Sequence, residues 1–453
     1  MAEAVRHDKT ARQLRLLSDA LDSGRLGPVR RLVNTLAPAE IGNLLESLPP
    51  GKREVVWGLV DAEDDGEVLL HVGDEVRESL IADMDPDELV AAVEDLDIDD
   101  LADLVEDLPD TVIDEVLKSM DRENRERLEQ VLSYPEDSAG RLMNPDVVTV
   151  RADVNVDVVL RYLRLRGELP DHTDHLFVVS RRHQYLGRVS LAALVTHEDT
   201  TPINRLIDDE QPAIDVGESD QEVARQFSDH DWVSAPVVDE NNILLGRITI
   251  DDVVDIIRSQ AGHQALGAAG LDEEEDLFSP IKRAVRGRVV WLGINLCTAF
   301  LAASVIGQFE LTLQKVVALA VLMPIVAGVG GNAAVQVLTL MVRGLALGQV
   351  GASNARILLW KESRVALING TLIGLLVGLI AFIWFHSLLL SLVITLALII
   401  NFLAAALAGV LLPLLLKRMN VDPAVAGTVV VTAVTDVMGF FSFLGLATLI
   451  LLH

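Results

Sequence analysis

The sequence predicts a multi-domain membrane protein: an acidic, all-α superhelical N-domain, two tandem α/β modules, a connecting helix and a five-span α-helical transmembrane domain. Half of the 453 residues are hydrophobic, yet the formal net charge is −30. The charge divides at residue 281, because residues 281–453 carry a net +7 and residues 1–280 a net −37. An acidic soluble part therefore precedes an apolar membrane part. An internal repeat within the acidic part indicates the paired modules.

We expect five consecutive segments in this chain. The N-domain occupies residues 1–135, the two modules 136–200 and 201–260, the connecting helix 261–281 and the membrane domain 282–453. The start of the chain is polar, so no secretory signal is expected. A strongly acidic soluble part disfavours nucleic acid as a partner. It favours cationic partners or a heavily hydrated surface, as in a protein from a salt-rich source.

The N-domain alternates short helical patterns with helix-start signals. Asp85-Pro86-Asp87-Glu88 offers an N-cap, a proline at the first helical position and an acid at the third. Asp97 and Asp121 are expected to begin two further helices. Little alternation of β-branched residues is present, so the pattern predicts a stack of short helices.

Residues 136–260 contain two copies of a helix, a strand, a polar turn, a strand and a second helix. The repeated motifs begin at Val178 and Val237, 59 residues apart, and both continue into a Leu-Gly-Arg sequence. Such a pair resembles tandem modules of the cystathionine-β-synthase (CBS) type. The second copy reads Thr249-Ile250-Asp251-Asp252, which is similar to the Thr-x-x-Asp that holds a nucleotide ribose in some CBS modules. That resemblance implies ATP or another adenine nucleotide at Thr249 and Asp252.

Four apolar runs predict five membrane spans, since each span needs about 20 residues. The runs are Val289–Phe309, Val316–Val342, Val365–Leu416 and Pro423–Leu452, and the third, of 52 residues, turns at His386-Ser387. Ten of the eleven basic residues in this part fall on the side of the N-terminal region. Basic loops stay in the cytoplasm. The N-terminal region is therefore expected in the cytoplasm, and His453 outside the cell membrane.

Asp436 lies in the last span, where a charged side chain marks a functional site. Thr428, Thr432, Thr435/Asp436 and Gly439 recur every three to four residues and share one helical face. This face predicts the wall of a cation path. The alternative is a neutral carboxylic acid that is hydrogen-bonded between helices.

The second span is expected to be irregular. It contains Pro324, followed by Gly328, Gly330, Gly331 and Asn332. Irregular backbone at membrane depth lines a wet cavity or is buried in protein, and broken helices often present carbonyls to ions. The alternative is close helix packing through small residues.

Two acid pairs in the soluble part each share a helical face. Asp99 and Asp103 are four residues apart, and Asp252 and Asp255 are three apart. Like charges at this spacing destabilise a helix unless a cation intervenes, and Mg²⁺ prefers carboxylates with retained water. The alternative is two solvated faces of an acidic protein.

With this order of domains, the chain resembles the MgtE family of Mg²⁺ channels over nearly its full length. The most specific matches are Pro324 to Asn332 with Val342-Arg343-Gly344, and Asp422-Pro423-Ala424 with Thr435-Asp436-Val437. The resemblance implies a homodimer in the lipid bilayer whose pore follows the two-fold axis between the second and fifth spans. The pore residues it implies are Asp436, Thr432, Gly328, Gly331 and Asn332.

The same resemblance implies closure of the pore by cytosolic Mg²⁺. The ions would bind between the N-domain, the CBS pair and the connecting, or plug, helix. The metal ligands implied by the match, besides Asp436, are Asp99, Asp103, Asp231, Asp252, Asp255, Asp422 and Glu67.

This chain departs from the family pattern in the connecting helix. Residues Arg258 to Gly270 contain no carboxylate where relatives have several. Fewer bridging ions are therefore expected there, unless the acid run Asp272–Asp276 replaces them. Ala334 also stands where a glycine is common, and we expect little change in conduction from it.

Two other functions remain possible from sequence. One is a carrier or channel for Mn²⁺, Co²⁺ or Ni²⁺, although oxygen ligands around Asp436, with only Met438 beside it, favour a hard cation. The other is a membrane-anchored nucleotide sensor, which leaves Asp436 unexplained. No nucleophile–base pair, Walker motif or thiolate metal site is present in the sequence, so an enzyme is not predicted. The single cysteine, Cys297, excludes an internal disulfide.

Overall fold

The computed structural model describes Leu17, residues 20–21, 26–94, 96–105, 107–267, 269–271, 276–351, 354–419 and 421–452. The chain forms two compact units. The first comprises Met1–Gln260 with Glu274–Ser279, and the second comprises Ala261–Glu273 with Pro280–His453. The acid run 272–276 lies outside the described residues except for Asp276, which pairs with Arg53.

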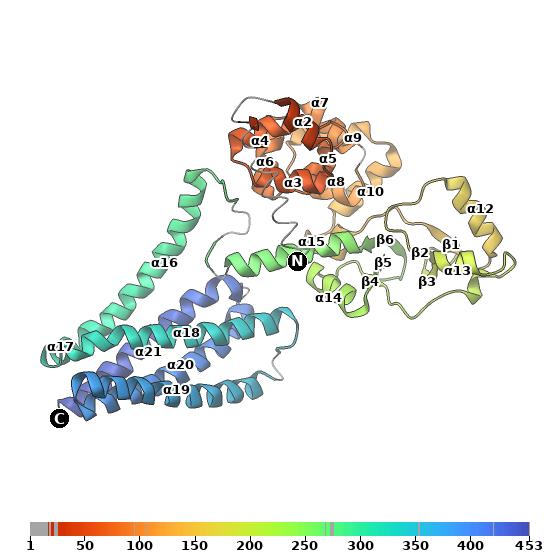
Figure 1. Ribbon diagram of the computed structural model, residues 1–453. Helices are drawn as coiled ribbons and strands as arrows, with labels where there is room; N and C mark the ends of the chain where they lie inside the picture. Colours follow the sequence, from red (N-terminus) through yellow and green to blue (C-terminus); the bar gives the residue numbers. More distant parts are fainter. Residues whose placement is uncertain are drawn as a thin grey trace. The chain divides into compact units, whose positions relative to one another are not determined.

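The N-domain is a stack of short helices, as the sequence predicts (Figure 1). Asp85 caps α7 in a capping box with Glu88, and Asp121 caps α10 by accepting from the backbone N–H groups of Glu123 and Asn124. Asp97 immediately precedes α8. The helices are α2 (Leu26–Val33), α3 (Pro38–Glu46), α4 (Pro50–Trp57), α5 (Asp65–Leu70), α6 (Asp74–Asp83), α7 (Pro86–Val93), α8 (Ile98–Val105), α9 (Asp110–Ser119) and α10 (Arg122–Leu132).

Each α/β module contains a three-stranded sheet, which confirms the predicted repeat. The first sheet has the order β1 (Thr149–Arg151), β2 (His175–Val179), β3 (Tyr185–Ser190), and the second has β4 (Ile214–Asp215), β5 (Ser234–Val238), β6 (Leu244–Thr249). In both, the first pair is parallel and the second antiparallel. The helices are α11 (Ala139–Leu142), α12 (Val156–Arg166), α13 (Leu191–Thr196), η1 (Ile203–Arg205), α14 (Asp220–His230) and α15 (Ile250–Gly267).

The N-domain and the second module share one hydrophobic core. Buried residues of the N-domain, such as Leu101 and Leu104, belong to the same cluster as Ile248 and Val253. Arg141 of α11 is buried and donates to the carbonyl of Ala102 in α8. Because this core is continuous, α8 and α15 hold fixed positions relative to each other within the first unit.

The connecting helix differs from its expected form. Residues up to Gly267 continue α15 without a break, so this segment is the C-terminal half of the last CBS helix. The described residues between Gly267 and Ile281 are not helical. A run without proline or a strong cap signal extends the existing helix rather than starting a new one, because adding a residue to a helix is easier than nucleating another.

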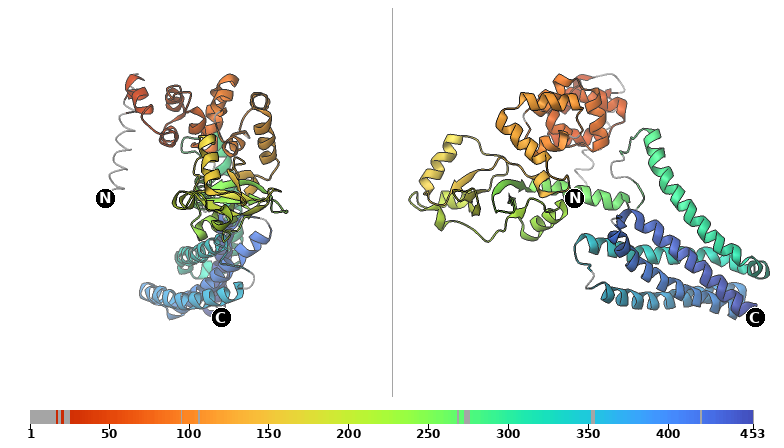
Figure 2. Two further views of the ribbon diagram at one scale, coloured as in Figure 1. Left: turned by 90° about the vertical axis from the view of Figure 1, so that its right-hand side faces the viewer. Right: turned by 180° about the vertical axis from the view of Figure 1, so that it is seen from behind.

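The second unit contains five helices that are long and apolar enough to cross a membrane, as predicted. They are α16 (Ile281–Gln308), α18 (Ala318–Ala346), α19 (Ala355–Phe385), α20 (Leu388–Arg418) and α21 (Pro423–Leu451). The short α17 (Glu310–Lys315) joins the first two, and His386 in left-handed conformation joins α19 to α20. Figures 1 and 2 show α18–α21 side by side, and α20 packs against α18, α19 and α21.

The prediction of a broken second span is wrong. Helix α18 runs without interruption through Pro324 and its three glycines. Pro324 is the seventh residue of α18, so its missing N–H removes one intrahelical hydrogen bond, to the Ala320 carbonyl, and the helix continues past it. Among these glycines, Gly330 serves close packing, since a Cβ there would lie 2.0 Å from the Asn401 amide nitrogen of α20, whereas a Cβ on Gly328 would meet no atom within 4 Å. The alternative of close helix packing therefore fits Gly330.

We predict that Gly66→Ala destabilises the N-domain. A Cβ at Gly66 in α5 would lie 2.0 Å from the backbone oxygen of Ala92 in α7. Backbone must then shift, at a cost of about 1–3 kcal/mol. Thermal unfolding of the purified protein measures the loss. Gly51→Ala is the matched control, since a Cβ there meets no atom within 4 Å. Equal stability of the two variants would contradict the contact.

Candidate functional site

An acidic cluster forms where α8 meets the start of α15. Asp99 and Asp100 come from the first turn of α8, and Asp251 and Asp252 from the first turn of α15. Asp252 repels Asp99, and both Asp251 and Asp252 interact with Asp100. Asp99 and Asp252, one from each acid pair predicted to bind metal, are thus neighbours. Sequence reasoning missed Asp100, whose signal was the density of acids between Asp97 and Asp103, and Asp251, whose signal was its place beside Asp252.

Burial and mutual repulsion hold protons on these carboxyls. Burial, followed by the charges of Asp97 and Asp103, raises the pKa of Asp100 to about 7. Burial, followed by the charges of Asp251 and Asp100, raises the pKa of Asp252 to about 8. Burial and the Asp252 charge raise the pKa of Asp99 well above its usual range. A cation in this position would relieve the repulsion and restore the ionised forms.

The environment of the Asp99 carboxylate indicates whether a cation could bind there. Its Oδ1 atom is buried and has no hydrogen-bond partner among the described residues. An unpartnered buried carboxylate oxygen is costly, and Mg²⁺ with part of its water shell is a suitable partner. Within the described ranges, no three His, Cys, Asp or Glu side chains form a ready-made metal cage. The cluster therefore suits a hydrated cation that bridges few carboxylates.

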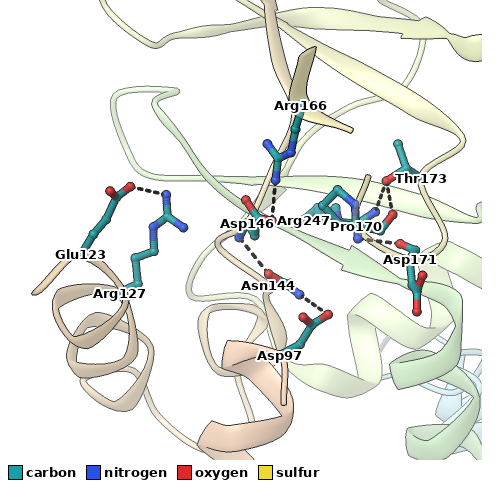
Figure 3. Close-up of polar contacts among 10 residues, drawn as sticks. All are labelled: Asp97, Glu123, Arg127, Asn144, Asp146, Arg166, Pro170, Asp171, Thr173 and Arg247. Carbon is teal, nitrogen blue, oxygen red and sulfur yellow. Dashed lines mark hydrogen bonds and ion pairs between the residues drawn. The ribbon is translucent and has the colours of Figure 1, made fainter. Parts of the chain in front are cut away.

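A polar network fixes α8 against the CBS pair (Figure 3). The side-chain amide of Asn144 donates to Asp97, 3.0 Å away, just before α8. Asp146, two residues on, forms an ion pair with Arg166 of α12. Arg247 of β6 donates to the Asp171 carbonyl. This hydrogen bond fixes β6, the strand that leads into α15, against the loop that contains Asp171. This frame keeps the two acidic helix starts close together despite their repulsion.

The other predicted ligands of the first unit lie around or away from this cluster. Glu67 and Asp103 are exposed and both raise the pKa of Asp100 by their charge. Asp255 is exposed one turn beyond Asp252 and lies 3.7 Å from Arg258. Asp231 ends α14 in left-handed conformation, and no interaction described for it reaches the cluster. The structure thus brings most, but not all, of the expected set together.

The expected nucleotide motif coincides with one end of the cluster. The Thr249 hydroxyl lies 3.1 Å from the Asp252 carboxylate, to which it can donate, and Thr249 is buried. In the first module Ser190 instead caps α13 by accepting from the Ala193 backbone. Asp252 is therefore shared between the nucleotide motif and the acidic cluster.

The predicted pore residues lie on two adjacent helices of the second unit. Asp436 on α21 is partly buried, and no described residue forms a hydrogen bond or ion pair with it. Gly331 of α18 faces Thr432 of α21, since a Cβ at Gly331 would lie 3.9 Å from the Thr432 methyl group. Gly328 and Asn332 share an exposed face of α18. A neutral acid hydrogen-bonded between helices of one subunit therefore finds no partner among the described residues.

Asp422 has a separate role in the second unit. It caps α21 by accepting from the Ala424 backbone, and its carboxylate also contacts the His263 imidazole of α15. One turn further along each helix, a Cβ on Gly267 would lie 2.9 Å from Val425. The C-terminal half of α15 thus packs on the first turn of α21 through a histidine rather than a carboxylate.

Three family models match the chain. They are the MgtE divalent cation transporter over residues 323–446, the MgtE intracellular N domain over 36–137, and the CBS domain over 139–198 and 206–259. The magnesium transporter MgtE of Thermus thermophilus is 32% identical over 451 residues, which cover 96% of this chain and 98% of that protein. The chain belongs to the MgtE family.

The chain is also similar to other MgtE proteins. The magnesium transporter MgtE of Bacillus subtilis is 26% identical over 430 residues, 94% of this chain and 95% of that protein. The crystal structure of the cytosolic domain of the Mg²⁺ channel MgtE in complex with ATP has a TM-score of 0.48 at 30% identity, over 53% of this chain and 98% of that one. This MgtE protein is thus a multi-pass membrane protein of a magnesium transporter family.

We predict that, without divalent cations, the first unit of this MgtE protein loses stability as pH rises through about 7 and 8. The folded-state pKa values of Asp100 and Asp252 lie above those of the unfolded chain. Each carboxyl therefore contributes its full stabilisation below the unfolded pKa, near 4. This stabilisation falls as the pH rises from there to the folded pKa, by up to about 1.4 kcal/mol per pH unit for each carboxyl, and is lost above the folded pKa.

Thermal unfolding in EDTA across this pH range measures the effect. Asp100→Asn should flatten the pH dependence, whereas Glu123→Gln on α10, far from the cluster in sequence, should leave it unchanged. Millimolar Mg²⁺ should remove most of the loss in the wild type. A pH profile that is the same in the wild type and in Asp100→Asn would contradict the proposed repulsion.

Proposed function

We propose that this protein is a Mg²⁺-selective channel that conducts Mg²⁺ inward across the cell membrane as a homodimer. The observation that carries the proposal is the Asp436 carboxylate, which stands in a membrane helix with no described partner of its own. An ionisable group at membrane depth marks an ion pathway. On α18, which packs against the helix of Asp436, Gly328 and Asn332 are exposed, and a Cβ on Gly328 would meet no atom within 4 Å.

Symmetry supplies the second charge that a divalent cation requires. In a two-fold dimer, residues on the axis occur in pairs, so two Asp436 carboxylates together balance one Mg²⁺. Mg²⁺ sheds its water reluctantly and binds oxygen ligands, and Thr432 adds a hydroxyl on the same face. Cations such as Co²⁺ and Ni²⁺ prefer nitrogen or sulfur ligands, of which only Met438 is near in sequence. Magnesium is therefore favoured over these alternatives.

Closure by cytosolic Mg²⁺ follows from the acidic cluster. Without a cation, Asp99, Asp100 and Asp252 repel one another, and this disfavours the packing of α8 on α15. A bound Mg²⁺ would join these helices and stiffen α15. Since α15 continues to Gly267 and its last turns pack on α21, the same helix reaches the start of the proposed pore helix.

The charge distribution supports a cytoplasmic N-terminus and an external C-terminus. Basic residues flank α16, α18, α19 and α20 on the side of the soluble part, and Lys315 is the exception. The match of residues 36–137 to the MgtE intracellular N domain supports the same orientation.

An adenine nucleotide at the second CBS module is a further proposed ligand. Thr249 and Asp252 are already paired, in the arrangement that could accept a ribose. The relative whose cytosolic domain was solved was in complex with ATP. A nucleotide that engages Asp252 would alter the acidic cluster directly. A nucleotide sensor without transport remains the less favoured function, because it gives Asp436 no role.

We predict that Asp436→Ala lowers Mg²⁺ uptake into proteoliposomes at least about tenfold, because the pore loses its fixed negative charges. Uptake is followed with a Mg²⁺-sensitive dye at zero membrane potential. Glu310→Ala is the matched control, since it removes an exposed carboxylate from α17. Unchanged flux in Asp436→Ala would remove Asp436 from the pathway.

We also predict that Mg²⁺ protects the chain from proteolysis near Gly262–Gly270. Protection should develop as Mg²⁺ rises through about the millimolar range, where a few carboxylates bind a hydrated ion. Gel analysis of limited digestion measures the rate. An unrelated substrate protein controls for effects of Mg²⁺ on the protease. Asp100→Asn with Asp252→Asn should shift protection to higher Mg²⁺, and protection that is indifferent to both Mg²⁺ and these substitutions would refute the gating model.

A further inference from the structure

Asn401 is a fully buried polar side chain in the middle of α20. Its exposed fraction is 0%, and its amide nitrogen donates to the Val326 carbonyl of α18, 3.0 Å away. Helix geometry already gives that carbonyl one donor, the Gly330 N–H. The Asn401 hydrogen bond is therefore a second one, which joins two helices rather than completing one of them.

Two glycines make room for this amide. A Cβ on Gly330 of α18 would lie 2.0 Å from the Asn401 nitrogen, and a Cβ on Gly439 of α21 would lie 2.7 Å from the same atom. At both distances a larger residue would force the Asn401 amide to move. The amide of Asn401 thus fills a notch between α18 and α21, and three helices meet at one group.

The notch lies at the level of the proposed pore residues. Gly439 follows Asp436 by three residues, and Gly330 lies between Gly328 and Gly331. On α18 a step of two residues turns the helix to nearly its opposite side. The face that contacts Asn401 is therefore opposite the exposed face with Gly328 and Asn332. Any change in the notch moves the exposed face relative to Asp436.

Interhelical hydrogen bonds also occur elsewhere in this unit. Thr395 of α20 donates to the Gly374 carbonyl of α19, 3.0 Å away, and a Cβ on Gly374 would lie 2.9 Å from the Thr395 backbone oxygen. This contact joins the same helix to a helix that carries none of the proposed pore residues. The Thr395 contact has the same chemistry as the Asn401 contact but lies away from the proposed pore. It therefore serves as a control that distinguishes a general loss of helix packing from an effect on the ion pathway.

We propose that Asn401 is a positioning residue that sets the spacing of α18 and α21 beside Asp436, and thereby the discrimination among divalent cations. The inference rests on the proposed conduction between these helices. Selectivity for a hydrated or partly hydrated ion depends on pore width and on the placement of oxygen ligands. The unpartnered Oδ1 of Asn401 among the described residues fits a group kept for geometry rather than for stability alone.

The test compares two ways of removing the amide. Asn401→Leu keeps most of the volume and deletes the hydrogen bond. The double variant Asn401→Ala with Gly330→Ala places a methyl group in the vacated notch, so it retains packing without the amide. Each protein is reconstituted in proteoliposomes, and the initial rates of Mg²⁺ and Ca²⁺ uptake are measured together with thermal unfolding and dimer elution.

We expect the ratio of Mg²⁺ to Ca²⁺ uptake to change by about threefold or more in a folded variant, the factor that corresponds to one neutral hydrogen bond. Thr395→Val should lower the unfolding temperature to a similar extent and leave the ratio unchanged. The inference is overturned if either folded Asn401 variant keeps the wild-type ratio of Mg²⁺ to Ca²⁺ uptake. It is also overturned if Thr395→Val changes this ratio as much as the Asn401 variants do. If both Asn401 variants fail to fold, Gly439→Ala and Asn401→Ser test the same notch. A changed ratio of Mg²⁺ to Ca²⁺ uptake in these variants supports the inference, and a wild-type ratio overturns it.

The proposed function can fail independently of this inference. Asp436→Ala is measured in the same assay, and undiminished Mg²⁺ uptake there rejects the proposed pathway itself. A loss of uptake in Asp436→Ala combined with wild-type selectivity in the Asn401 variants rejects only the role of Asn401.

Discussion

Carboxyl groups held partly or wholly out of water are the constraint that both parts of the molecule share. In the soluble unit, Asp99, Asp100 and Asp252 are brought together by a shared apolar core and a polar network, although burial and mutual repulsion raise their pKa values. In the membrane unit, Asp436 stands without a described partner. Hydrophobic burial supplies the free energy that holds these charges in place. In the proposed function, a divalent cation is the group that relieves them.

Small residues are the corresponding constraint among the membrane helices. The hydrophobic effect contributes little to the association of helices in lipid. Close backbone packing and interhelical hydrogen bonds therefore drive it. Gly330, Gly439 and Asn401 combine both in one place, between α18, α20 and α21. Close packing of this kind does not adjust gradually. A single amide can therefore define the distance between two helices that flank the proposed ion path.

Regular features were predicted well because their signals are local. Asp85 and Asp121 cap helices through atoms two or three residues away, and the five spans follow from runs of apolar residues. The break expected in α18 failed because glycine is compatible with helix and with turn alike, and packing against Asn401 decides between them. The first part of the expected connecting helix extends α15 as far as Gly267, since no local signal ends α15 earlier.

The sequence by itself determined the division into acidic and apolar parts, the repeat of the two modules and the number of spans, and it predicted Asp436 as a pore residue. Each depends on composition or on periodicity along the chain. Only the tertiary structure decided that Asp100 and Asp251 join Asp99 and Asp252, and that Asn401 contacts two glycines of other helices. These contacts connect residues tens or hundreds of positions apart. They are set by how helices pack around a common core, which no local pattern encodes.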